Sequence, residues 1–150
     1  MSDRVHIVVP GDQPRQIAQS PHLDRLREYG EVVVYESTPG DVAVKADRVR
    51  DCEVIINSRG VVAWREELEH LPKLQMIATC SIGTDMIDLE RARGAGIVVS
   101  NQPGRTAPVV AEHMFGMMFS LAKSVAYQTA EIKAGRWTRR MNASLQGKVI

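Results

Sequence analysis

The sequence lacks the features of several common protein classes. It has only two cysteines, Cys52 and Cys80, which lie far apart without metal-ligand spacing, so a disulfide scaffold and a cysteine-rich metal site are excluded. We expect both cysteines to be buried, reduced thiols. Nineteen basic residues balance eighteen acidic ones and are interspersed with them, so no basic stripe indicates binding to nucleic acid or an anionic membrane.

A long uninterrupted apolar run is also missing. The most apolar window, residues 107–121, contains Glu112 and His113 and is followed by Lys123. It therefore falls short of the roughly 18 apolar residues that a membrane span needs, and it predicts a buried helix instead. The N-terminus enters a strand-like segment without a secretory signal, which predicts a cytoplasmic protein.

The first hundred residues alternate between short β-branched runs and stretches long enough for a helix. Each run has four or five residues, is nearly all apolar and is bounded by glycine, proline or polar residues, as in strands buried on both faces of a parallel sheet. Five strands with four crossovers predict a doubly wound α/β sheet, with the flavodoxin-like strand order 2-1-3-4-5. The runs are 5–9, 32–35, 54–57, 76–79 and 97–100.

Local signals mark the expected helices. Ser20 followed by Pro21 predicts the start of a helix that Gly30 ends. Further helical patterns cover residues 41–50 and 65–71. Asp88 is expected to be an N-cap, with Leu89 and Ala92 turned inward.

The pattern changes after residues 101–104, which have the composition of a turn. Residues 106 or 107 to 134 predict one long helix, ended by Gly135 and apolar on nearly every side in its first half. Such a helix must be surrounded by protein, which indicates a further domain or a partner subunit. Residues 145–150 resemble a turn that enters a new strand. We therefore expect one domain at 1–104, and a linker helix with the first strand of another domain at 105–150.

Five motifs along this pattern are similar to the N-terminal half of the D-isomer-specific 2-hydroxyacid dehydrogenases. They occur in the same order and spacing, and the resemblance extends from Val5 to Ile150. The motifs are GTDMID at 83–88, GIVVSNQPG at 96–104, VAEH at 110–113, GRW at 135–137 and LQGK at 145–148.

The resemblance implies a flavodoxin-like substrate domain followed by a long interdomain helix that leads into a Rossmann domain. The glycine-rich turn for NAD or NADP would begin just after Ile150, so no cofactor-binding residue is assigned here. The family's catalytic arginine, glutamate and histidine also come later, so no catalytic residue is assigned and this chain alone is expected to be inactive. The implied substrate is a small 2-hydroxy or 2-oxo acid, and the implied assembly is a homodimer through the 107–134 helix.

The candidate substrate-binding residues follow the ends of three predicted strands. By resemblance, the backbone amides around Ile82 and Gly83 bind the substrate carboxylate, with Gly83 allowing consecutive N–H groups to converge. Ser58 and Arg59 follow the third strand, where the arginine could pair with a carboxylate in a bidentate manner. Asn101 follows the fifth strand. A plain turn, a solvated arginine and a turn-forming asparagine are the alternative interpretations.

Other polar residues and motifs favour no different function. Glu112 and His113 are expected to bond across an interface, and Asp85 with Asp88 lacks the further oxygen ligands of a metal site. A receiver domain would need an aspartate where Asn57 and Ser58 stand, and a flavodoxin would need hydroxyls in residues 10–14. A non-catalytic binding or corepressor-like module on the same scaffold stays open.

Overall fold

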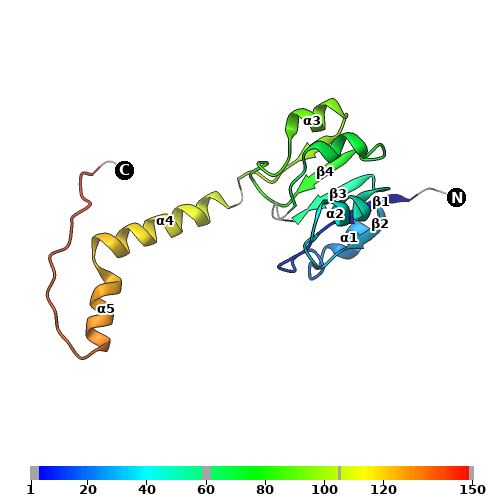
Figure 1. The fold of residues 1–150 in the computed structure, drawn as a ribbon. Helices are drawn as coiled ribbons and strands as arrows, with labels where there is room; N and C mark the ends of the chain where they lie inside the picture. Colours follow the sequence, from blue (N-terminus) through cyan, green and yellow to red (C-terminus); the bar gives the residue numbers. More distant parts are fainter. Residues whose placement is uncertain (1–3, 59–61, 105, 149–150) are drawn as a thin grey trace. The chain divides into compact units, whose positions relative to one another are not determined.

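The computed structural model describes residues 4–58, 62–104 and 106–148, and its contacts divide the chain into two compact units. The first unit, Met1–Pro103, is an α/β fold, and the second, Gly104–Ile150, consists of two helices and an extended segment (Figure 1). The interpretation of the second unit as the entrance to a dinucleotide-binding domain stays a prediction.

The first unit contains a parallel sheet of five strands in the order β2-β1-β3-β4-β5, which confirms the expected flavodoxin-like topology. Parallel pairing brings the carboxyl ends of all the strands to one edge, where doubly wound sheets bind ligands. The strands are β1 (Val5–Val9), β2 (Gly30–Val34), β3 (Val54–Asn57), β4 (Met76–Thr79) and β5 (Val98–Ser100).

Gly30 belongs to a strand, so the prediction that it ends a helix is wrong. It pairs with Val5 at the start of β2, and a Cβ atom there would lie 2.2 Å from the carbonyl oxygen of Val5. Only glycine fits this close approach of two backbones. β2 therefore begins two residues before the predicted 32–35 segment.

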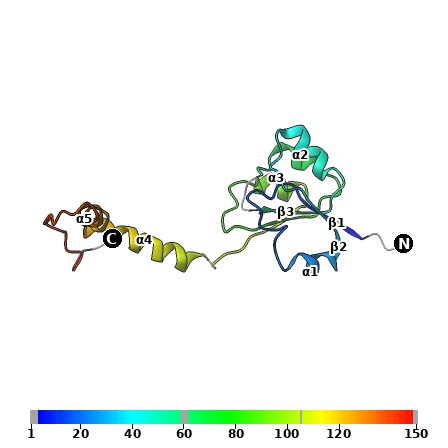
Figure 2. The same ribbon diagram turned by 90° about the horizontal axis from the view of Figure 1, so that it is seen from below.

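The helices of the first unit cover the two faces of the sheet unequally. α2 (Val42–Val49) and α3 (Leu89–Gly94) lie on one face, and α1 (Leu23–Arg27) lies on the other (Figure 2). The N-cap side chains Asp41 and Asp88 accept hydrogen bonds from Val44 N at 2.8 Å and Arg91 N at 3.0 Å. The predicted cap at Asp88 is thus confirmed.

Two local predictions about these helices are wrong. α1 has His22 as its N-cap, and the Ser20 hydroxyl only accepts a bond from His22 N within a turn. α1 buries none of its residues, so little packing extends it. The helix predicted at residues 65–71 is present, as the 3-10 helix η2 (Glu66–His70). Leu89 is 47% exposed, although Ala92 points inward as expected.

The core lies between the sheet and the helices α2 and α3, which cover one of its faces. Alternate strand residues Val8, Ile55 and Ile77 are fully buried, and they join one cluster with Leu68 of η2 and Ala92 of α3. The intervening residues Ile56 and Ala78 are half-buried, and Val98 of the edge strand is 61% exposed. One face of the sheet is therefore packed more fully than the other.

The second unit does not contain the single long helix predicted for residues 107–134. α4 (Ala107–Ala122) and α5 (Val125–Lys133) are separated at Ser124, whose φ of 52° and ψ of 36° are left-handed. This conformation interrupts the helical hydrogen-bond ladder and redirects the chain. No glycine or proline marks the position, so the sequence carried no sign of the break.

The apolar character of α4 is as predicted, although the helix is shorter. Taken by itself, the second unit buries no residue of α4, and Met114, Phe115 and Met117 are each at least half exposed. The Phe115 and Phe119 rings stack with their centroids 6.5 Å apart. Within the described residues, no helix combines the length and hydropathy required to cross a membrane.

The packing of the first unit generates a stability prediction. Ile77 is 0% exposed in the core, so Ile77→Ala should lower the free energy of unfolding by about 3–4 kcal/mol through lost burial and a residual cavity. Urea unfolding followed by circular dichroism would measure the change. Leu89→Ala, at a side chain that is 47% exposed, is the control and should cost less than about 1.5 kcal/mol. Equal losses in the two variants would contradict this description of the core.

Candidate functional site

A loop of residues 81–86 follows β4 at the carboxyl edge of the sheet. Throughout this loop the backbone carbonyls accept hydrogen bonds from the protein. In its first half, Gln102 N donates to the Ser81 carbonyl at 3.0 Å, and Asn101 Nδ2 donates to the Ile82 carbonyl at 2.7 Å. The Ser81 hydroxyl donates to the Gly83 carbonyl at 2.7 Å. These three carbonyl oxygens are therefore all occupied. We call residues 81–86 the amide loop.

The second half of the amide loop is held in the same way. Ile87 N donates to the Thr84 carbonyl at 2.8 Å, Arg65 Nη2 donates to the Asp85 carbonyl at 3.0 Å, and Trp64 N donates to the Met86 carbonyl at 2.7 Å. Every carbonyl of the amide loop thus accepts a hydrogen bond from the same unit.

The N–H groups of the amide loop are not engaged in this way. Among the described residues, none of the N–H groups of residues 81–86 donates a hydrogen bond to the protein. Ile82 and Gly83 are exposed. A loop with occupied acceptors and available donors is suited to an anion, because successive N–H dipoles converge on negative charge. A carboxylate would take charge-assisted hydrogen bonds there.

The buried side chain of Asp12 links the segments that follow β1 and β3 by hydrogen bonds. Its side chain is 0% exposed and accepts hydrogen bonds from the N–H groups of Gln16 at 3.0 Å, Ile17 at 3.1 Å and Ala18 at 2.8 Å, and from the Ser58 hydroxyl at 3.3 Å. Burial alone would raise the pKa of Asp12, but these hydrogen bonds outweigh it and lower the pKa below its ordinary value.

The structure brings only some of the predicted site residues together. Ile82 and Gly83 lie in the amide loop, and Asn101 contacts that loop through the Ile82 carbonyl. Ser58 is 2% exposed and its hydroxyl is bonded to Asp12, so it belongs to the framework of the edge. Arg59 lies outside the described residues. The assignment of all five to substrate binding stays a prediction.

Two residues of this edge were missed from the sequence. Asp12 stands in a proline- and glycine-containing turn, so its polar side chain was unremarkable there. Arg65 contacts Asp85 across 20 residues, and no local pattern predicts such a contact.

The cysteines do not add a nucleophile to this edge. Cys80 is half-buried rather than fully buried as expected, and burial together with the nearby Asp12 charge raises the pKa of its thiol. Burial raises the pKa of Cys52 to about 12. Both cysteines are free, and both stay protonated at neutral pH. No group of three His, Cys, Asp or Glu side chains in the described ranges could hold a metal ion.

The first unit does not fit a dinucleotide cofactor. In such folds a phosphate binds the N–H groups of the glycine-rich turn after the first strand. Here the buried Asp12 carboxylate already accepts the N–H groups of residues 16–18, and its negative charge would repel a pyrophosphate.

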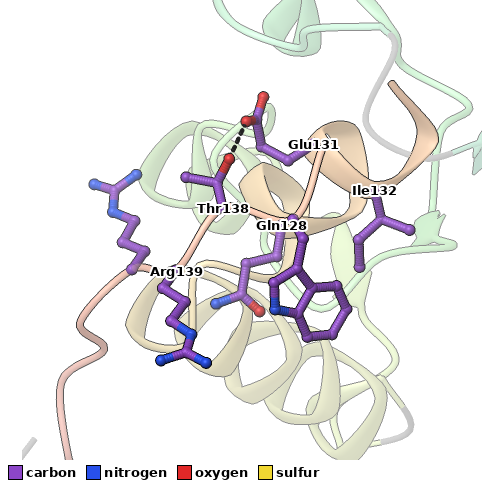
Figure 3. A pocket seen from close by; sticks show the side chains of 7 residues that line it. Gln128, Glu131, Ile132, Thr138 and Arg139 are labelled. Carbon is purple, nitrogen blue, oxygen red and sulfur yellow. Dashed lines mark hydrogen bonds between the residues drawn. The ribbon is translucent and has the colours of Figure 1, made fainter. Parts of the chain in front are cut away.

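A hollow of about 380 Å³ lies in the second unit, between α5 and the segment that follows it (Figure 3). Its only carboxylate, Glu131, is paired with Arg136 and accepts a hydrogen bond from Thr138 Oγ1 at 2.5 Å, and these two contacts lower its pKa. The hollow therefore offers no free acid or base. Its lining residues are Gln128, Glu131, Ile132, Trp137, Thr138, Arg139 and Arg140.

Comparison with known proteins identifies relatives over most of the chain. The family model described as D-isomer specific 2-hydroxyacid dehydrogenase, catalytic domain, matches residues 12–142. The D-3-phosphoglycerate dehydrogenase of Methanocaldococcus jannaschii is 32% identical over 127 residues, which are 83% of this chain and 24% of the relative. A putative 2-hydroxyacid dehydrogenase of Haemophilus influenzae is 37% identical over 103 residues, which are 69% of this chain and 32% of the relative.

A solved structure supports the same relationship. The NADPH-dependent glyoxylate/hydroxypyruvate reductase of Sinorhizobium meliloti, in complex with NADP and malonate, superposes with a TM-score of 0.72 at 28% identity. The match covers 96% of this chain and 44% of that one. This chain thus spans about a quarter to a third of the length of the two curated relatives.

The buried Asp12 carboxylate generates a pH prediction. Asp12→Asn keeps one acceptor oxygen, so it should lower the free energy of unfolding by about 1–3 kcal/mol at pH 7 through lost hydrogen bonds. Because the folded pKa lies below the ordinary 3.8, this stabilisation is fully present above that value and is lost as the pH falls through the folded pKa.

Urea unfolding of both proteins at pH 7, 5 and 3 would measure the difference. It should be similar at pH 7 and 5 and smaller at pH 3. Asp24→Asn, at a carboxylate that is 86% exposed, is the matched control and should have little effect. A difference that grows on acidification would refute this account of Asp12.

Proposed function

The chain belongs to the D-isomer specific 2-hydroxyacid dehydrogenase family, and on that premise we propose that it is the substrate-binding part of an oxidoreductase. The whole protein transfers hydride between NAD(P) and a D-2-hydroxy acid or the corresponding 2-oxo acid. The observation that carries this proposal is the amide loop, whose carbonyls are all occupied while its N–H groups are available.

The task of this chain in that reaction is to hold the substrate carboxylate. The N–H groups of Ile82 and Gly83 donate to its oxygens, at the sheet edge where doubly wound folds bind ligands. A fixed carboxylate orients the neighbouring carbonyl carbon, and such positioning supplies much of an enzyme's rate advantage. In a plain turn some of these N–H groups would donate to backbone carbonyls, and here the described residues show none that does.

The other predicted site residues have supporting roles in this proposal. Arg59 pairs with the carboxylate or with the distal end of the substrate, because its planar fork suits bidentate contact. Asn101 borders the substrate and holds the Ile82 carbonyl, and Ser58 fixes the start of the segment that carries Arg59.

The cofactor and the acid-base chemistry belong to other parts of the whole protein. The nicotinamide supplies or accepts the hydride when it is bound there. Because the first unit has no dinucleotide turn after β1, none of its described residues is assigned to NAD(P). No catalytic residue is assigned in this chain, and we expect the chain alone to show no turnover with NADH.

The second unit supplies a contact between subunits in this proposal. α4 is apolar on nearly every side in its first half, and its own unit buries none of its residues, so it needs protein around it. We assign this role to residues 107–134 as part of a homodimer interface, with the break at Ser124 separating α4 from α5.

Binding of a simple carboxylate tests the amide loop. Malonate titrated into ¹⁵N-labelled protein should shift the amide resonances of Ile82, Gly83 and Thr84, with a Kd on the order of 1–10 mM for so small a ligand. Malonamide has the same shape without the charge, so it should produce much smaller shifts. Shifts confined to other regions, or equal shifts with both ligands, would count against carboxylate recognition by the loop.

Association of the chain tests the role of α4. The 150-residue protein should self-associate as its concentration rises, and Met114→Lys with Met117→Lys should weaken this association at least about tenfold by placing charge on the apolar surface. Analytical ultracentrifugation would measure the change. Val42→Lys, at an isolated exposed valine of the first unit, is the control and should leave association unchanged. A monomer at high concentration would overturn the interface proposal.

A further inference from the structure

Arg65 joins two loops at the carboxyl edge of the sheet. Its guanidinium donates from Nη1 to the Trp64 carbonyl at 3.1 Å and from Nη2 to the Asp85 carbonyl at 3.0 Å. Asp85 lies in the amide loop, so one side chain ties the segment after β3 to the loop after β4. Both contacts are made to backbone oxygens, which lets the side chain fix the backbone directly.

The segment on which Arg65 stands is itself firmly held. Trp64 is 0% exposed, and it forms a parallel bridge with Ile87 in which Trp64 N donates to Met86 O at 2.7 Å and Asp88 N donates to Trp64 O at 3.0 Å. Lys45 Nζ lies 5.0 Å from the centre of the Trp64 ring. Arg65 therefore connects the amide loop to a segment that is fixed in the core through Trp64.

The charge of Arg65 also matters for an anion at this loop. Its guanidinium carries a positive charge, and within the described part of the chain it forms no ion pair with a carboxylate. Both of its contacts are with neutral carbonyls, so its positive charge is not cancelled by a partner. That charge adds to the field of the amide dipoles and opposes the Asp85 carboxylate, whose Oδ2 would lie 2.9 Å from a Cβ atom on Gly83.

We propose that Arg65 is a positioning residue for carboxylate binding: it holds the Asp85 carbonyl away from the ligand and keeps the N–H groups of the amide loop available. The inference rests on the proposed function, since it assigns the support of the same anion site. Without Arg65 the Asp85 carbonyl loses its donor, and the peptide group between Asp85 and Met86 can rotate. A carbonyl oxygen turned toward the ligand would repel a carboxylate.

Two variants of Arg65 and one matched control test this role in the full 150-residue chain. Arg65→Gln should weaken malonate binding roughly tenfold, which corresponds to one hydrogen bond of about 1.4 kcal/mol, and should reduce the shifts of Ile82 and Gly83 at saturation. Arg65→Lys keeps the charge and one donor, so it should recover part of the affinity.

The control is Arg48→Gln. Arg48 Nη1 also donates to two backbone carbonyls, those of Pro10 and Ser37, each at 2.6 Å, but it does not contact the amide loop. Arg48→Gln should lose about as much thermal stability as Arg65→Gln. It should nevertheless bind malonate with the affinity of the unaltered chain. A purely structural role for Arg65 predicts no such difference between the two glutamine variants.

The possible results are distinguishable. Unchanged malonate affinity in a folded Arg65→Gln protein would overturn the role of Arg65 and leave the proposed function intact. Equal losses of affinity in Arg65→Gln and Arg48→Gln would also overturn it, because general destabilisation would then explain both. If malonate shifts no amide of the loop in the unaltered chain, the proposed function fails, and this inference fails with it.

Discussion

The candidate site depends on the one-sided hydrogen bonding of residues 81–86. Backbone carbonyls and N–H groups occur in equal number in such a loop, so it attracts anions only if the carbonyls are occupied elsewhere. Here a backbone N–H, a hydroxyl, an amide or a guanidinium occupies each of them. The donors come from the residues that follow β5, from the loop and its next residue, and from the segment after β3. The polarity of the loop is therefore a product of its surroundings.

Asp12 provides the opposite arrangement on the same edge. There a buried carboxylate accepts the N–H groups of the loop after β1 and the hydroxyl of Ser58. Those donors are then unavailable to a ligand, whereas the donors of the amide loop remain available. One sheet edge thus contains a loop whose N–H groups are bonded to an internal carboxylate and a loop whose N–H groups donate to no described residue. This contrast explains why the carboxylate-binding role is assigned after β4 and why no phosphate site is assigned after β1.

Sequence reasoning was most accurate where the determinants were local. The period of apolar residues located β1, β3 and β4, and the predicted cap at Asp88 depends on a contact only three residues away. It was wrong where packing decided the outcome. His22 is the N-cap of α1 in place of Ser20, and α1 buries none of its residues. Leu89 is exposed although its pattern favoured burial. Ser124 ended α4 without any residue that normally breaks a helix.

The sequence by itself determined the class of fold, the strand order and the family, because hydrophobic periodicity and short motifs are written in consecutive residues. It also located Ile82, Gly83 and Asn101 at the ends of strands. Only the tertiary structure decided that Asp12 is buried beneath Ser58, and that Arg65 holds a loop 20 residues further along the chain. The physical reason is that these hydrogen bonds join separate strand ends, and their partners become neighbours only when the parallel sheet has formed.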